Sequence, residues 1–168
     1  MAAEIALPLH AQGLLVGEYQ IKAAFLYNFA KFVEWPPEAF SDAKSPIVIA
    51  ILGEDPFDPS LEEIIAGKTV QGRPLVVKHW KNLDGSWQCH ILFVSASARG
   101  FLGDIFQKTG LSNVLTVGEM EGFAQRGGMI NFILFENKVR FEINHKAAES
   151  AGLKISSKLL SLARKVWE

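Results

Sequence analysis

Three short apolar runs, separated by segments with helical periodicity, constrain the fold of this chain more than any other feature. They cover residues 47–52, 90–94 and 113–117. Runs of this length and composition are typical of strands buried on both faces, as in a parallel sheet that is covered by helices. Because strands alternate with helical segments along the chain, we expect an α/β fold with a mixed, mainly parallel sheet and helices on both faces.

The segments between these runs supply the predicted helices and one further strand. Helices are expected at residues 19–33, 59–66, 98–108, 145–152 and 155–166, a short helix within residues 118–126, and a strand at residues 75–79. The first helix is predicted from a stripe at helical spacing, made of Ile21, Ala24, Phe25, Asn28, Phe29 and Phe32. The last helix is predicted from a core stripe made of Ile155, Leu159, Leu162, Ala163 and Val166.

A β-hairpin is predicted near the C-terminus. Its strands, residues 129–135 and 138–143, flank the turn residues Glu136 and Asn137. Apolar and polar residues alternate along the second strand, with Val139, Phe141 and Ile143 on one face and Arg140, Glu142 and Asn144 on the other. This alternation predicts a strand with one covered face, close to an edge of the sheet.

The length of 168 residues suits one domain with a single core. We expect residues 18–168 to form this domain. Residues 1–17 are mildly apolar, aperiodic and rich in small residues, and we interpret them as the remnant of a processed signal peptide or as a flexible lead-in. No apolar run reaches the length of a membrane span.

Composition and motifs argue against several classes of function. The formal net charge is −1 and no polybasic cluster is present, so nothing indicates binding to nucleic acid or to an anionic membrane surface. The hydrolase motif Gly-x-Ser-x-Gly and a complete Gly-x-Gly-x-x-Gly motif are absent. Gly67-Lys68-Thr69 resembles the end of a phosphate-binding loop, but Glu62 replaces the required glycine and the local order is helix, loop, strand.

The histidines and the cysteine do not predict a reaction centre. No two histidines have metal-ligand spacing on one helix or hairpin; they are His10, His79, His90 and His145. The single cysteine, Cys89, cannot form an internal disulfide and begins an apolar run. Cys89 and His90 are adjacent on a predicted strand and therefore point to opposite faces, so we interpret both as structural.

Polar residues at the carboxyl ends of the strands are candidates for a binding site. Glu54, Asp55 and Asp58 follow the first strand, and Ser95, Ser97 and Glu119 follow the next two strands of the apolar set. Ligands of open α/β sheets bind at this edge. The pattern indicates either a shallow binding cleft or ordinary caps and turns.

Basic residues supply a second group of candidates. Lys68 and Arg73 lie in a glycine-bounded loop, which either holds an anionic ligand or partner or is only a turn. Arg140 is either a partner contact or half of a surface ion pair on the hairpin. Gly127-Gly128 is either a tight turn or a hinge that lets residues 118–126 move. The predicted binding residues are Lys68, Arg73, Arg140, Asn144 and Glu119.

Eight segments in order along the chain add a family resemblance. They are residues 22–36, 51–57, 67–68 with 72–73, 89–95, 114–118, 127–130, 140–144 and 155–160. Together they resemble the YfiR-like family of periplasmic proteins over residues 19–166. The resemblance implies a periplasmic α/β domain that can dimerise, preceded by a secretory signal that is cleaved.

The resemblance also implies a regulatory role without enzymatic activity, and we expect no cofactor and no metal. The best-known member of the family is a repressor that binds the periplasmic domain of an inner-membrane diguanylate cyclase, and an outer-membrane lipoprotein can sequester it. That repressor carries disulfides linked to redox control, whereas this chain has only Cys89. An intramolecular redox switch is therefore excluded here.

Three functions follow from these observations. The first is a periplasmic regulatory binding protein that lowers cyclic di-GMP signalling by masking the periplasmic domain of a cyclase. The alternative is a periplasmic sensor of an anionic or aromatic metabolite, and the two roles can coexist. The third, an unrecognised enzyme, requires a polar cluster built from Glu54, Asp55, His90 and Ser95.

Overall fold

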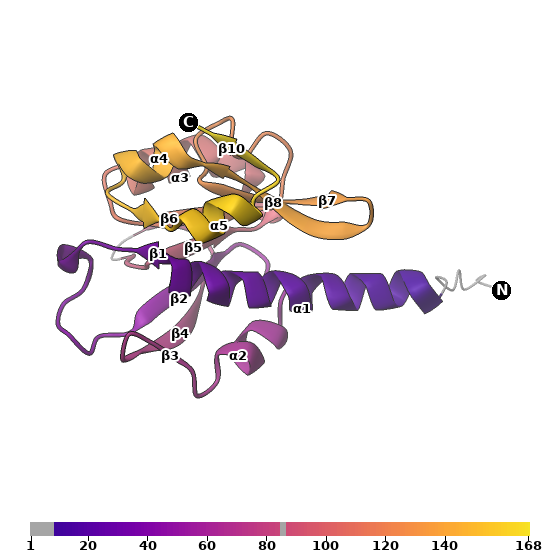
Figure 1. Cartoon of the computed structure of the whole chain (residues 1–168), viewed down its shortest axis with the longest axis horizontal. Helices are drawn as coiled ribbons and strands as arrows, with labels where there is room; N and C mark the ends of the chain where they lie inside the picture. Colours follow the sequence, from indigo (N-terminus) through magenta and orange to yellow (C-terminus); the bar gives the residue numbers. More distant parts are fainter. Residues whose placement is uncertain (1–8, 85–86) are drawn as a thin grey trace.

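The chain folds around one eight-stranded mixed sheet, seen in a computed structural model that describes residues 9–84 and 87–168 (Figure 1). The strand order is β10-β8-β7-β6-β5-β2-β4-β3, and β1 and β9 form a second, two-stranded sheet. The strands are β1 (Val33–Glu34), β2 (Ile47–Leu52), β3 (Thr69–Val70), β4 (Arg73–Trp80), β5 (Ile91–Val94), β6 (Leu115–Gly118), β7 (Ile130–Phe135), β8 (Lys138–Asn144), β9 (Lys154–Ile155) and β10 (Lys165–Trp167). The helices are α1 (Leu9–Phe32), α2 (Ser60–Ile65), α3 (Leu102–Thr109), α4 (His145–Ser150) and α5 (Ser157–Leu162), with 3-10 helices η1 (Pro37–Ala39) and η2 (Ala96–Phe101).

The centre of the sheet is parallel, as the apolar runs predicted. β2 pairs in parallel with β4 and β5, and β5 and β6 continue the parallel set to β7. The hairpin β7–β8 adds the antiparallel pair, with Glu136 and Asn137 at positive φ in its turn. Every residue of β2 and β5 is buried. The predicted fold class is therefore confirmed.

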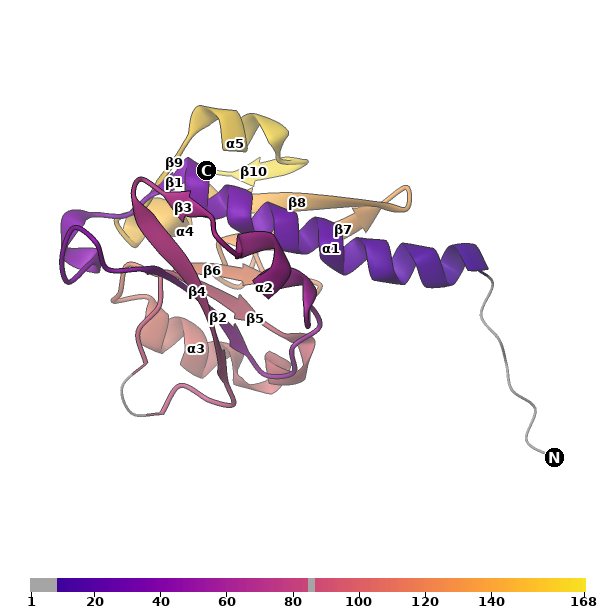
Figure 2. The ribbon, with the colours of Figure 1, turned by 90° about the horizontal axis from the view of Figure 1, so that it is seen from below.

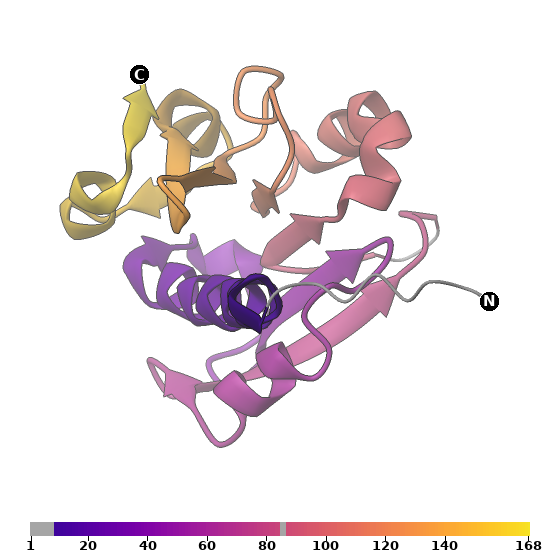
Figure 3. The same ribbon diagram turned by 90° about the vertical axis from the view of Figure 1, so that its right-hand side faces the viewer.

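Two hydrophobic cores lie on opposite faces of the sheet, because alternate residues of β2 point to opposite sides. Ile49 and Ile51 join one core with residues of α1 and α2, whereas Val48 and Ala50 join the other with residues of α3. Figure 3 looks along α1 and shows it and α3 on opposite sides of the central strands. The helices thus cover both faces of the central strands β2 and β5, whose residues are all buried.

Helix α1 is longer than predicted and buries a slightly different stripe. It begins at Leu9 rather than at Tyr19. Ile21 is 48% exposed and Ala24 is also exposed, whereas Lys22 is 4% exposed, so the predicted stripe was wrong at Ile21 and Ala24. Phe29 is fully buried, and its ring lies 5.3 Å from that of Phe141 in the hairpin. The helix is therefore held by aromatic packing on β8, and this packing turns Lys22 inward.

The predicted lead-in, residues 1–17, falls partly on residues 1–8, which lie outside the described part of the chain. From Leu9 onward the chain is helical. Within the described ranges 9–84 and 87–168, no helix is both long enough and apolar enough to cross a membrane. The boundary between lead-in and domain stays a prediction.

Two predicted helices were wrong. The span 155–166 contains β9, α5 and β10 instead of one helix, because Ser156 caps α5 by accepting from the Leu159 N–H at 3.1 Å and the helix ends at Leu162. Leu162 is 51% exposed, and β10 extends the sheet beside β8. The span 118–126 forms turns after the end of β6. The side chain of Asn131 bonds both backbone groups of Met120 there, and thus fastens the turns to the sheet.

The long helix and the hairpin project from the same side of the molecule. Figure 1 shows α1 and the β7–β8 hairpin extending in one direction beyond the central strands, and Figure 2 shows them side by side from below. This direction is also the one in which the parallel strands end, since Gly118 at the end of β6 pairs with Asn131 near the start of β7. The projecting elements therefore frame the carboxyl edge of the sheet.

Candidate functional site

The carboxyl edge of the sheet brings together residues that are far apart in the sequence. Leu52 pairs with Val94, and Val94 pairs with Gly118. The residues that follow these three positions, among them Ser95 and Glu119, therefore lie along one edge, as predicted. Ser97 belongs to the same edge, and its Oγ accepts a hydrogen bond of 2.9 Å from the backbone N–H of Glu54.

A buried ionic cluster lies at this edge, and we call it the Lys22 cluster; it comprises Glu18, Tyr19, Lys22 and Glu119. Lys22 Nζ lies 2.7 Å from Glu119 Oε2 and 3.3 Å from Glu18 Oε1. The side chains of Lys22 and Glu119 are only 6% and 10% exposed. A buried ion pair of this kind is costly to break, because each charge would be left without its partner and without water. The cluster thus joins α1 to the turns after β6.

Tyr19 completes the cluster as a neutral donor. Its hydroxyl donates a hydrogen bond of 3.0 Å to Glu119 Oε1. Burial raises the pKa of Tyr19 well above its ordinary value, and the neighbouring charge of Glu119 and the hydrogen bond to it raise it further. Both oxygens of the Glu119 carboxylate are therefore engaged, one by the ammonium of Lys22 and one by the phenol.

An open groove of about 380 Å³ lies over the Lys22 cluster, and we call it the α1–hairpin groove. Its lining comes from α1, from the turns after β6 and from β7, and comprises Glu18, Tyr19, Lys22, Glu119, Met120, Glu121, Phe132, Ile133 and Leu134. Three carboxylates and one ammonium line it, so the groove carries an excess of negative charge. Phe132, Ile133 and Leu134 form one wall, and Leu134 is 54% exposed. The groove therefore offers apolar walls around an acidic floor.

Of the predicted binding residues, Glu119, Arg140 and Asn144 lie at this end of the molecule. Glu119 is part of the groove floor. Arg140 pairs across the hairpin with Ile133, which lines the groove. Asn144 uses its side chain within the fold: its Oδ1 accepts from the Ala147 N–H at 3.0 Å, and its Nδ2 donates to the Ala124 carbonyl at 2.9 Å. Asn144 thus ties the turns after β6 to the start of α4.

Lys68 and Arg73 lie elsewhere, so the predicted residues do not form one patch. β4, which begins at Arg73, is five positions away from β8 in the strand order. At about 4.8 Å per strand, this separation is about 24 Å. The guanidinium of Arg73 stacks on the Phe40 ring at 3.7 Å and donates to the carbonyls of Asp42 and Ser45. Lys68 is exposed, with Nζ 5.7 Å from the ring centroid of Tyr27 on α1.

Comparison with known proteins identifies the family. A family model described as YfiR/HmsC-like matches residues 19–164. The chain belongs to the YfiR/HmsC-like family. The match spans the Lys22 cluster from Tyr19 onward and the whole hairpin, and it confirms the resemblance inferred from the sequence. A search among curated proteins finds no match.

His90 has the structural role that the sequence predicted for it. Its Nδ1 accepts a hydrogen bond of 3.0 Å from the Val48 N–H, and its Nε2 lies 2.9 Å from the Ala39 carbonyl. Burial lowers the pKa of His90, and the charge of Arg73 lowers it further, against the opposing effect of the Ala39 carbonyl. This family member therefore keeps a neutral imidazole that fastens the segment around η1 to the sheet.

Cys89 and the residues of the proposed enzyme cluster also have defined places. Cys89 is buried, and burial raises the pKa of its thiol to about 12. His90 and Ser95 stand at opposite ends of β5, about 16 Å apart at the usual rise per strand residue. The cluster that the enzyme hypothesis requires is therefore not assembled.

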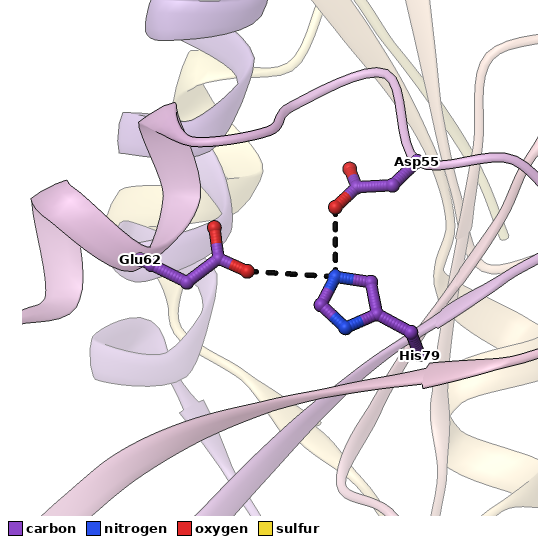
Figure 4. Close-up of side chains that lie close together, drawn as sticks. All are labelled: Asp55, Glu62 and His79. Atoms are coloured by element: carbon purple, nitrogen blue, oxygen red, sulfur yellow. Dashed lines mark hydrogen bonds and ion pairs between the residues drawn. The ribbon is translucent and has the colours of Figure 1, made fainter.

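Sequence reasoning missed two groups. Lys22 gave a signal, because it stands in the buried stripe of α1 as a charged residue among apolar ones. The second group, Asp55, Glu62 and His79, comes from three separate segments and is drawn in Figure 4. It could have been predicted only from the pairing of β4 with β2, which places His79 beside Ile51 near the end of β2 and so close to Asp55. Spacing along one helix or hairpin could not reveal it.

Proposed function

We propose that this protein is a periplasmic regulatory protein that restrains a membrane-bound diguanylate cyclase by binding the cyclase's periplasmic domain. Membership of the YfiR/HmsC-like family supports the class of partner. The α1–hairpin groove is the observation on which the proposed position of the binding site rests. Occupation of the groove by the cyclase would lower cyclic di-GMP signalling, and an outer-membrane lipoprotein that competes for the same surface would relieve the restraint.

The groove has the composition of a protein-binding surface. The exposed side chain of Leu134 lines the groove, and the exposed Ile21 lies outside it on the projecting helix α1, where the same partner can cover it. Contacts at the centre of an interface carry most of the binding energy when apolar anchors fill a groove. The excess of carboxylates in the groove favours a partner segment with basic residues beside its apolar anchors.

The floor of the groove is preorganised, which lowers the entropy lost on binding. Lys22 and Glu119 are held by short contacts inside the fold, and Asn131 fixes the backbone of Met120. A surface that does not have to be ordered on association retains more of its interaction energy as affinity. We therefore expect the partner to dock without rearrangement of residues 118–128.

Calorimetry with the purified periplasmic domains of membrane diguanylate cyclases from the same genome tests the proposal. Leu134→Glu introduces a charge on the wall of the groove at an exposed position, so it should leave the fold intact. We expect it to weaken binding at least about 10-fold, which corresponds to about 1.4 kcal/mol. The matched control is Leu111→Glu, because Leu111 is 96% exposed and lies in the turn after α3. The control should bind like the wild type.

Charge reversals separate the two predicted groups of basic residues. Arg140→Glu should weaken binding by about 1–3 kcal/mol if Arg140 pairs with an acidic side chain of the partner beside the groove. Lys68→Glu tests a second contact region at the β4 edge and should have no effect if the groove is the whole site. Wild-type affinity in both Leu134→Glu and Arg140→Glu would remove the groove from the binding site.

The absence of binding to every cyclase domain tested would instead favour the sensor of an anionic or aromatic metabolite. A ligand at one hundred times its dissociation constant stabilises a protein by about 2.7 kcal/mol, which a thermal-shift screen detects. A screen in which no metabolite raises the melting temperature would count against this alternative.

A further inference from the structure

Three potential metal ligands converge at the carboxyl edge of β2 and β4, away from the residues that line the α1–hairpin groove. We call them the His79 cluster; they are Asp55 in the loop after β2, Glu62 on α2 and His79 on β4 (Figure 4). His79 Nε2 lies 2.8 Å from Asp55 Oδ2 and 3.4 Å from Glu62 Oε1. All three ligand atoms lie within 4.8 Å of one another.

Contacts within the fold orient Asp55 and Glu62 toward His79. Asp55 Oδ1 accepts a hydrogen bond of 2.7 Å from the Phe57 N–H, so the carboxylate is oriented with its other oxygen toward His79. Glu62 is held by α2, which is anchored by the buried residues Leu61 and Ile65. Hydrogen bonds that orient a ligating carboxylate are a usual feature of metal sites.

One N–H of His79 cannot donate a good hydrogen bond to both carboxylates. Both carboxylates approach the same nitrogen of His79, and one N–H can make a short, straight hydrogen bond to only one of them. Glu62 Oε2 is shielded from solvent and has no hydrogen-bond partner among the described residues. A divalent cation in place of the proton would bind the ring nitrogen and both carboxylates at once.

The spacing of the ligand atoms fits a small transition-metal ion. Zinc binds imidazole nitrogen and carboxylate oxygen at about 2.0–2.2 Å in tetrahedral geometry, which places its ligand atoms about 3.4 Å apart. The separation of 3.4 Å between His79 Nε2 and Glu62 Oε1 already has this value, and that of 2.8 Å to Asp55 Oδ2 needs only a small opening. An imidazole in the donor set favours zinc over magnesium or calcium, which prefer oxygen ligands alone.

We propose that Asp55, Glu62 and His79 bind a divalent transition-metal ion, for which zinc is the best-fitting candidate. The side chain of His79 is 50% exposed, so water can complete the coordination from the solvent side. The ion would clamp α2 and the loop after β2 onto β4. The proposal does not depend on the cyclase partner, because it concerns the isolated protein.

Calorimetric titration of the tag-free, chelator-treated protein with zinc chloride tests the proposal. We expect one site in the wild type, and at least about 10-fold weaker binding in both His79→Gln and Asp55→Asn. Magnesium chloride should bind much more weakly than zinc. The matched control is His145→Gln: His145 also lies near two carboxylates, at 3.5 Å from Glu149 and 3.9 Å from Glu168, but through different ring nitrogens. This control should bind zinc like the wild type.

Thermal unfolding provides a second readout that does not rely on the titration. Zinc should raise the melting temperature of the wild type and of His145→Gln, but not that of His79→Gln or Asp55→Asn. Circular dichroism without metal shows whether each variant is folded before it is compared. Wild-type zinc affinity in both His79→Gln and Asp55→Asn would overturn the proposal. An equal loss in His145→Gln would also overturn it, because zinc would then bind to surface histidines in general.

Discussion

Each end of the sheet buries a titratable side chain, and the two side chains are stabilised in different ways. At the carboxyl end, Lys22 is charged and is held by two carboxylates under an open groove. At the amino end, His90 is neutral and is held by backbone groups, with the Phe40 ring stacked at 4.5 Å. The charges at the carboxyl end can attract or repel charged groups of a partner. The neutral His90 at the amino end only joins segments of the fold through hydrogen bonds. Buried charge is thus concentrated where the apolar walls are exposed.

The largest effect is expected from Lys22→Met, which leaves Glu119 and Glu18 buried without their cation. Removing one partner of a buried ion pair costs about 3–5 kcal/mol. Chemical denaturation should therefore show a loss of about that size in the free energy of unfolding. The loss tests whether the carboxyl end depends on its ion pair for stability.

The double variant Lys22→Met with Glu119→Gln is the matched control for this prediction. The second substitution removes the nearer of the two stranded carboxylates and leaves only Glu18 without its cation, and the amide oxygen of glutamine can still accept from Tyr19. The double variant should recover a large part of the stability that Lys22→Met loses. A double variant less stable than Lys22→Met would show that the pair itself, and not the stranded charge, accounts for the loss.

The fold could be predicted further from the sequence than the site could. The buried strands 47–52 and 90–94 and the hairpin turn at Glu136 and Asn137 were predictable because their signals are local, namely continuous apolar runs and a turn that favours positive φ. The C-terminal segment was wrong because β10 exists only through its pairing with β8, a contact that helical spacing cannot report. Tertiary pairing overrides local propensity in such a short segment.

The site was predictable only where one strand end could be aligned with the next. The position of Glu119 at the carboxyl edge was predicted in this way, because parallel strands end at one edge; its role in binding stays a prediction. Lys22 and His79 were missed, since their partners lie 97 and 24 residues away in the sequence. Arg73 was predicted as a binding residue from its charge, yet the structure uses its guanidinium for carbonyl contacts within the fold.

A pair of arginines compares the two ends directly, because each stacks on a phenylalanine ring at 3.7 Å. Arg73 lies over Phe40 at the amino end, and Arg164 lies over Phe135 on the hairpin. Arg73 also donates to two carbonyls, so Arg73→Gln should cost about 2–3 kcal/mol of unfolding free energy. The exposed Arg164→Gln should cost only about 0.5–1 kcal/mol. Equal losses of unfolding free energy in the two variants, measured by urea denaturation, would contradict the view that the arginine at the amino end contributes more to stability.

The turns after β6 provide the next test, since they decide whether the carboxyl end is fixed or hinged. A Cβ at Gly128 would overlap the buried ring of Phe123, so Gly128→Ala should destabilise the fold by about 1–3 kcal/mol. Gly103→Ala is the matched control, because α3 leaves open space there, and alanine should stabilise the helix by about 0.5–1 kcal/mol. A neutral Gly128→Ala would mean that residues 118–128 shift easily, as the hinge hypothesis requires.

The smallest effect is the pH dependence that His90 confers on the amino end. Burial lowers the pKa of His90 in the folded state, so the unfolded chain binds the proton more readily. Stability is therefore full above the ordinary histidine pKa and is lost as the pH falls toward the lowered pKa. Between pH 7.5 and 5.5 this one group can remove at most about 1.4 kcal/mol. Denaturation curves at several pH values measure the slope.

Two variants test whether the change of stability with pH comes from His90. His90→Asn keeps an acceptor for the Val48 N–H but does not titrate, so its stability should change less between pH 7.5 and 5.5 than that of the wild type. Arg164→Gln at the opposite end should keep the wild-type slope, because it leaves His90 untouched and strands no buried carboxylate. The same slope in His90→Asn and in the wild type would place the pH dependence elsewhere in the molecule. The neutral end would then be insensitive to acid, and the contrast between the two ends would rest on the ion pair alone.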